Sequence, residues 1–157
     1  MKEWVGLLAR LVTGAVWIVA GAVKLPDPAQ SVDAVRAYQL LPSSLVQPVG
    51  QLLPVIEIVV GATLVLGLLT RGSAIVSALL FAAFIIGIAS VWARGISIDC
   101  GCFGGGGYDA DATSKYPWEI ARDAALLAAS LFVAWLPSTR LSLDRLMFGR
   151  ALEPEGL

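Results

Sequence analysis

The chain contains no histidine, and only 15% of its 157 residues are charged. The lack of histidine removes the commonest acid–base side chain and the commonest metal ligand. With only two cysteines as well, a closed zinc site within one chain would need carboxylate ligands. The formal net charge is −1 and long basic runs are missing, which disfavours nucleic acid as a partner. We therefore expect no nucleic-acid binding and no metal site.

Apolar residues take the place of the missing charges, since 57% of the chain is hydrophobic and its mean hydropathy is +0.79. Four segments have the roughly 20 residues that a helix needs to cross a bilayer. Tryptophans stand at their ends, as amphipathic rings do at a bilayer interface. We expect an all-α integral membrane protein, a single membrane domain over residues 1–157 built as a four-transmembrane-helix bundle. The expected spans are residues 4–23, 45–69, 73–92 and 118–136.

The first segment has a second interpretation, as a signal peptide, because residues 20–22 are small. A signal peptide has an apolar core of about 7–15 residues. This segment is longer and contains Arg10, so we favour a span.

The connections between the spans are unequal. We expect residues 70–72 to form a short turn, which would make the second and third spans an antiparallel hairpin. The first loop, residues 24–44, is longer, and its apolar side chains recur at helical spacing. We expect a short interfacial helix there, with these side chains on one face: Val32, Val35, Tyr38 and Leu41.

An even number of spans places both termini on one side of the membrane. Basic residues near span ends favour the cytoplasm. The side of the termini carries Lys2, Arg71, Arg140, Arg145 and Arg150, and the other side carries Lys24, Arg36, Arg94 and Lys115. We therefore expect a multi-pass protein of a bacterial plasma membrane with cytoplasmic termini. Residues 137–157 then form a cytoplasmic tail, and the loop 93–117 is extracytoplasmic.

Both cysteines, Cys100 and Cys102, lie in this last loop, separated by Gly101 and preceded by Asp99. A disulfide that closes a loop of about three residues contributes only about 1.6 kcal/mol, against about 3 kcal/mol for a 15-residue loop. So tight a ring is strained and easily reduced, and Gly101 permits it because glycine has no Cβ. We predict an exposed, redox-active dithiol with Cys100 and Cys102 as catalytic residues and Asp99 and Gly101 in support. A structural disulfide, two inert thiols and an intersubunit metal site are the alternatives.

Charged residues inside the spans form a second candidate site. An ionisable side chain in a membrane is expensive and normally has a partner or a function. We expect Glu57 to pair with Arg122, with Arg10 as the competing partner, and Asp123 to join them. The network either fixes helix register or forms a proton or quinone site below the dithiol.

Several motifs resemble those of a known family. The motifs of the first half are similar to DoxX-like membrane proteins, and those of the second half resemble the MauE branch, named for methylamine utilisation. The DoxX-like motifs are residues 10–14, 21–28, 38–42, 54–57 and 61, and the MauE-like motifs are residues 99–104 and 118–123.

The resemblance implies a four-helix membrane bundle that takes part in thiol–disulfide traffic outside the cytoplasm. MauE proteins are linked to maturation of the disulfide-rich small subunit of methylamine dehydrogenase. The layout is also similar to vitamin K epoxide reductase and to bacterial disulfide-generating proteins, which use a quinone and a second cysteine pair. This chain has a single pair. We expect no required cofactor, and a quinone is the cofactor that the resemblance suggests.

The function expected from the sequence is a membrane thiol–disulfide redox protein. Its partner is expected to be a thioredoxin-like or other extracytoplasmic thiol protein. If the protein is an enzyme, the expected class is thiol–disulfide oxidoreductase. A non-catalytic scaffold that recruits redox proteins is the alternative, and a small transporter is a third. A homo-oligomer is compatible with the sequence.

Overall fold

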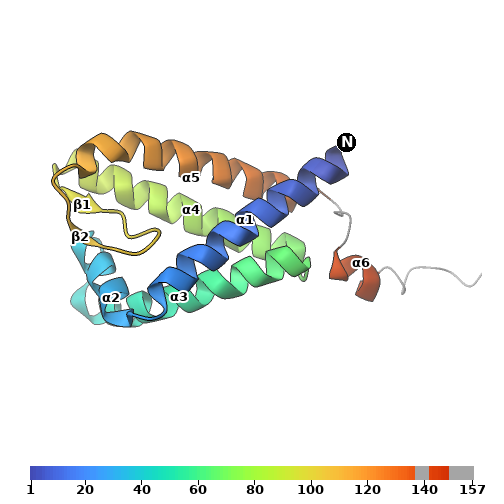
Figure 1. The fold of residues 1–157 in the computed structure, drawn as a ribbon, viewed down its shortest axis with the longest axis horizontal. Helices are drawn as coiled ribbons and strands as arrows, with labels where there is room; N and C mark the ends of the chain where they lie inside the picture. The colour runs from blue at the N-terminus through green and yellow to red at the C-terminus, as the bar shows by residue number, and fades with distance from the viewer. Residues whose placement is uncertain (137–141, 149–157) are drawn as a thin grey trace, which may run out of the picture.

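The computed structural model describes residues 1–136 and 142–148 and is mostly helical. Four of its helices are long. Figure 1 shows a small hairpin and a short helix, α2, together at one end of them. Of the expected cytoplasmic tail, residues 137–141 and 149–157 lie outside the described residues. The helices are α1 (Lys2–Lys24), α2 (Pro28–Ala37), α3 (Ser43–Leu66), α4 (Thr70–Ala93), α5 (Ala112–Trp135) and α6 (Leu143–Phe148). The strands are β1 (Ile98–Asp99) and β2 (Gly107–Tyr108). The sequence predicted an all-α protein, whereas the described chain also contains this short hairpin.

Helices α1 and α3 lie against each other because glycines let their backbones approach. A Cβ added to Gly61 would stand 2.6 Å from the Gly14 carbonyl oxygen. A Cβ added to Gly21 would stand 2.6 Å from the Pro54 carbonyl oxygen. Small residues permit such close packing where lipid removes the hydrophobic drive between helices. These glycines therefore allow close packing between α1 and α3.

Helices α4 and α5 form the second pair, joined by buried hydroxyls. The Ser77 and Ser130 hydroxyls lie 2.8 Å apart, and the Trp17 indole N–H donates to Ser77 at 2.7 Å. The Trp17 ring also lies 4.3 Å from the Phe81 ring, centroid to centroid. These contacts tie α1 to the α4–α5 pair through the core.

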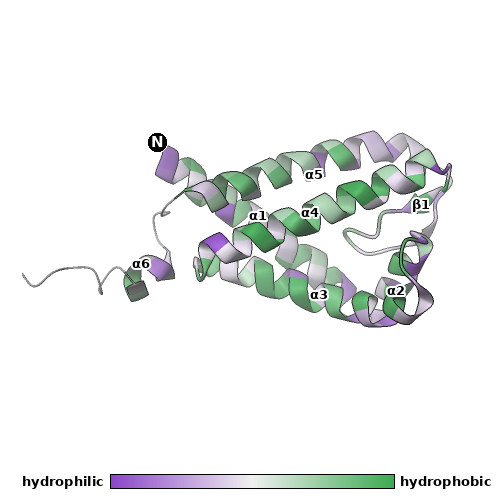
Figure 2. Cartoon of the chain, turned by 180° about the vertical axis from the view of Figure 1, so that it is seen from behind, coloured by the Kyte–Doolittle hydropathy of each residue, from purple (hydrophilic) through white to green (hydrophobic). Residues whose placement is uncertain are grey.

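Three of the described helices, α1, α3 and α4, are long and apolar enough to cross a membrane. Helix α5 is equally long, with 24 residues. It begins at Ala112 rather than near residue 118 and carries four charged side chains in its first half: Lys115, Glu119, Arg122 and Asp123. Figure 2 shows mostly hydrophobic residues along α3 and α4. The fourth expected span thus lacks the composition that marks the other three.

The two ends of the bundle differ (Figure 1). The N-terminus, α6 and the turn between α3 and α4 lie at one end, and α2 and the β-hairpin lie at the other. The turn comes earlier than expected, because α3 ends at Leu66 and Gly67 follows it with a φ of +69°, which suits glycine. The Asp144 carboxylate of α6 accepts the backbone N–H groups of Leu69 (2.7 Å) and Thr70 (2.8 Å). These bonds hold α6 against the turn.

Helix α2 occupies the expected first loop and packs on the start of α3. Asp27 caps it by accepting the Gln30 N–H at 3.1 Å, and Pro28 follows at the first helical position. The Ser31 hydroxyl donates to the Gly50 carbonyl at 2.7 Å. A Cβ on Gly50 would lie 2.5 Å from the Val32 Cα, so glycine is required at this crossing.

Candidate functional site

The cysteine loop folds into the end of the bundle. Strands β1 and β2 pair antiparallel, with Ile98 opposite Tyr108 and Asp99 opposite Gly107. Only 7% of Cys100 and 6% of Cys102 is exposed, so the expectation of an exposed dithiol is wrong for this structure. The physical reason is packing, because the loop contributes to an apolar cluster with side chains of α4 and α5. That cluster includes Ile88, Val91, Ala112 and Tyr116.

Glycines allow the loop to lie against α2 and the end of α1. Gly101 has φ +66° and Gly106 has φ +107°, conformations that L side chains rarely adopt. A Cβ added to Gly101 would stand 2.9 Å from the Ala34 Cβ, and one added to Gly106 would stand 2.5 Å from the same atom. A Cβ on Gly104 would lie 2.7 Å from a Val23 methyl. The glycines therefore let the loop that carries the two thiols pack closely against α1 and α2.

The two cysteines contact each other and are held by neighbours. No disulfide joins them in this structure. The Cys102 backbone N–H donates to the Cys100 sulfur at 3.4 Å. The Tyr38 hydroxyl donates to the Cys100 carbonyl at 2.7 Å, and the Asp99 carboxylate accepts the Gly101 N–H at 2.8 Å. The motif is thus tied to the end of α2 and to its own acidic residue.

The surroundings of Cys102 hold it in the protonated form. The pKa of the Cys102 thiol is raised, first by its hydrogen bond with Cys100 and next by burial. Arg122 opposes this shift, while the negative charge of Asp123 adds to it. The Arg122 guanidinium pairs with Asp123 at 2.9 Å and lies 4.8 Å from the centre of the Phe103 ring. Two of the four intramembrane charges expected from the sequence, Arg122 and Asp123, therefore meet at the dithiol.

Glu119 is a residue of this site that the sequence interpretation missed. Its side chain is within hydrogen-bonding contact of the Cys100 thiol. Its Oε2 atom is buried and has no hydrogen-bond partner among the described residues. The helical spacing was the available signal, since Glu119 precedes Arg122 and Asp123 by one turn and shares their face. One face of α5 thus presents two carboxylates and a guanidinium to the cysteine loop.

The expected Glu57–Arg122 pair is wrong. Glu57 is paired with Lys24, whose Nζ lies 2.6 Å from Oε1, and the two side chains are 0% and 4% exposed. Lys24, expected in a loop, is the last residue of α1 and is carried to α3 by the close packing of these helices. Its Nζ also lies 5.5 Å from the centre of the Phe84 ring. The pair is therefore part of the α1–α3 interface.

Arg10, the competing partner for Glu57, lies toward the other end of the bundle. It is buried, with 1% of its surface exposed. Its guanidinium stands beside Gly67, where an added Cβ would be 2.6 Å from Nη1, and it is attracted by the charge of Asp144. Arg10 therefore lies at the end of the bundle where α6 packs, away from Glu57.

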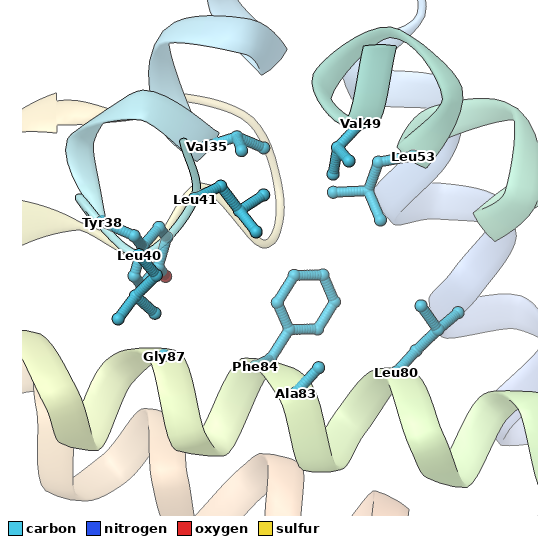
Figure 3. Close-up of a pocket in the computed structure, with 10 residues that line it drawn as sticks. All are labelled: Val35, Tyr38, Leu40, Leu41, Val49, Leu53, Leu80, Ala83, Phe84 and Gly87. Atoms are coloured by element: carbon cyan, nitrogen blue, oxygen red, sulfur yellow. The ribbon is translucent and has the colours of Figure 1, made fainter. Parts of the chain in front are cut away.

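Two cavities bear on the expectation of a quinone. The larger, about 290 Å³, lies between α2, α3 and α4 (Figure 3), and Phe84 projects into it. Its lining is apolar apart from the Tyr38 hydroxyl, which already donates to the Cys100 carbonyl. A second cavity adjoins Cys102 and Arg122 but measures only about 10 Å³. The first cavity therefore offers a quinone ring little beyond apolar contact, and the second has no room for one.

Comparison with known proteins identifies the family. The family model described as methylamine utilisation protein MauE matches residues 2–136, which include all four long helices and the cysteine loop. No curated protein and no solved structure matches the chain. The match covers most of the chain and agrees with its apolar helices. The chain therefore belongs to the MauE family of methylamine utilisation proteins and is a multi-pass membrane protein.

Proposed function

We propose that this protein is a thiol–disulfide redox protein of methylamine utilisation, with Cys100 and Cys102 as its redox couple. The observation that carries the proposal is the contact between two thiols that are surrounded by Glu119, Arg122 and Asp123. Ionisable groups next to a thiol pair control the proton that must move in exchange. Inert core thiols have no need of such groups, and a structural disulfide over so short a loop contributes little.

The reaction is reversible exchange with another protein. A dithiol and a partner disulfide become the Cys100–Cys102 disulfide and a partner dithiol, so two electrons and two protons pass to the partner. The reverse reaction oxidises a client. A thioredoxin-like or other extracytoplasmic thiol protein is the expected partner. No step is routed through a quinone, since thiol–disulfide exchange with a protein partner balances without one.

We further propose that α5 is the fourth span, since it is as long as α3 and α4 and packs along α4. Both termini are then cytoplasmic, and the cysteine loop faces the extracytoplasmic side of a bacterial plasma membrane. The likeness to DoxX-like proteins and the assignment of one membrane domain remain predictions of the sequence.

The test is capture of the partner. The Cys102→Ser variant retains Cys100 and lacks the thiol that resolves a mixed disulfide. Expressed as the full chain in a methylamine-utilising cell and quenched with acid, it is expected to carry a disulfide-linked extracytoplasmic protein that is released by reductant. The doubly substituted Cys100→Ser, Cys102→Ser protein is the control. If that control supports growth on methylamine as well as the wild type does, the scaffold alternative replaces this proposal.

A further inference from the structure

The two sulfur atoms of the dithiol have different surroundings. The Cys100 sulfur accepts the Cys102 backbone N–H at 3.4 Å, and it is also the partner of the Cys102 thiol. Hydrogen bonds donated to sulfur favour its thiolate form. The Cys102 thiol is the donor in this pair. It is directed toward Cys100, whose carbonyl oxygen lies 3.9 Å from the Cys102 sulfur. In this pair, therefore, the Cys100 sulfur receives hydrogen bonds and Cys102 donates them.

Glu119 stands where the proton of Cys100 can go. Its side chain contacts the Cys100 thiol, and its second oxygen is buried with no partner among the described residues. Because Cys100 is only 7% exposed, bulk water has little access to the thiol proton. A carboxylate beside the thiol can then accept its proton.

Several other charged or titratable groups face Glu119. Arg122 and Asp123 lie one turn further along α5, and Asp99 lies in the cysteine loop. Tyr38 approaches from the end of α2. Arg122 is the cation among them, and it is shared with Asp123 at 2.9 Å. None of the others is in hydrogen-bonding contact with both Glu119 and the Cys100 thiol in the described structure.

We propose that Cys100 is the attacking thiol, that Cys102 resolves the mixed disulfide, and that Glu119 takes the Cys100 proton and returns it. The inference rests on the function proposed above. The Cys100 thiol gives its proton to Glu119, and the thiolate attacks one sulfur of a partner disulfide. The partner's other sulfur leaves as a thiolate and takes that proton. The Cys102 thiol then attacks Cys100 in the mixed disulfide, and its proton goes to the second partner thiolate as the Cys100–Cys102 disulfide forms.

A role as base and a role as a mere negative charge have opposite consequences. A fixed carboxylate beside a thiol repels the thiolate, so its removal would accelerate attack. A base that removes the proton accelerates attack, so its removal slows it. Glu119→Gln separates the two roles by the sign of the change, because glutamine keeps the shape of the side chain.

The experiment measures reaction with hydroxyethyl disulfide, a small uncharged probe. Full-length Cys102→Ser protein in lipid nanodiscs is mixed with the probe from about pH 5 to about pH 9. The rate of mixed-disulfide formation is read by intact mass. The same is done for Cys100→Ser, and for Glu119→Gln, Glu119→Asp and Asp111→Asn in the Cys102→Ser background. Asp111 is the matched control, since it is an exposed carboxylate at the start of α5 with no side-chain capping bond.

Cys100→Ser is expected to react about tenfold more slowly than Cys102→Ser, because the attacking thiol is lost. Glu119→Gln is expected to slow Cys100 about 100-fold near neutral pH and to shift the rise of rate to higher pH. Glu119→Asp restores part of the rate, which a loss of folding would not allow, and Asp111→Asn changes nothing. Equal rates for the two single-cysteine proteins, or an unchanged or faster Glu119→Gln, overturn the inference. If neither cysteine reacts while both alkylate in denatured protein, the proposed function itself fails.

Discussion

At the scale of single residues, the buried pair of Lys24 and Glu57 shows how this protein neutralises charge in its interior. The 2.6 Å contact joins α1 to α3, and neither side chain is more than 4% exposed. The second oxygen of Glu57 has no hydrogen-bond partner among the described residues. The pair is therefore a contact whose loss leaves one charge with nothing to balance it.

Glu57→Gln is expected to lower the free energy of unfolding by about 3 to 5 kcal/mol, because it leaves the Lys24 ammonium uncompensated. Lys24→Met with Glu57→Gln removes both charges and is expected to recover most of that loss. Equilibrium unfolding in detergent measures the effect, with Lys2→Met as the matched control at the exposed start of α1. Wild-type stability in the single variant would contradict the assignment.

The thiol of Cys102 gives a dependence of stability on pH. Its pKa is raised in the folded protein, so the folded state holds this proton more firmly than the unfolded state. The stabilisation is complete below the ordinary thiol pKa of about 8.5 and is lost as pH rises toward the folded value. We expect the unfolding free energy to fall between about pH 8 and pH 9.5 and to fall less in Cys102→Ala. If the unfolding free energy fell equally with pH in the wild type and in Cys102→Ala, the raised pKa of Cys102 would be disproved.

At the scale of elements, the contact of the cysteine loop with α2 decides where the thiols lie. Gly101 faces the Ala34 side chain and has φ +66°. Gly101→Ala is expected to cost about 1 to 3 kcal/mol, through backbone strain and the close approach to Ala34. It also exposes the thiols, which faster alkylation by iodoacetamide would report.

Ala34→Gly is the companion variant, because it removes the atom that the new methyl group meets. Combined with Gly101→Ala, it is expected to slow alkylation back toward the wild type while the cost of positive φ remains. Gly72→Ala is the matched control, since no atom lies within 4 Å of its added Cβ. Alkylation as slow in Gly101→Ala as in this control would show that the loop is not held by α2.

The elements were predictable to different degrees. Hydropathy located the four long helices, because long apolar runs leave few alternatives to a helix. Helix ends were less certain: polar residues such as Lys115 continue α5 toward Ala112 beyond its apolar part. The burial of the cysteine loop was not predictable, because a glycine-rich segment normally indicates an exposed loop. In the structure this loop packs against Ala34 and joins an apolar cluster with side chains of α4 and α5.

The charges of the site show the same limit. Each of Glu57, Arg122 and Asp123 was expected to have a partner, since a charge inside a span needs one. Which partner it has depends on helix rotation and on how far α1 continues, and hydropathy reports neither. Lys24 therefore appeared to be a loop residue, whereas it is the ion-pair partner of Glu57.

At the scale of the whole molecule, the bundle has two chemically distinct ends (Figure 1). Single cysteines in a Cys100→Ser, Cys102→Ser background can report their sides. Tyr108→Cys, at an 84% exposed site of the hairpin, is expected to react with an impermeant maleimide on intact cells. Gly72→Cys, at the opposite end, is expected to react only after permeabilisation. The reverse pattern would invert the orientation and remove extracytoplasmic partners from the account.

The most direct test of the central claim is the reduction potential of the Cys100–Cys102 pair in the full-length protein. It is measured by equilibration with glutathione redox buffers in nanodiscs, followed by alkylation and intact mass. Exchange-active pairs have potentials above about −300 mV, and structural disulfides lie below that value. The account predicts a disulfide that forms reversibly with a potential above about −300 mV. A lower potential, or two thiols that never form a disulfide, would contradict it.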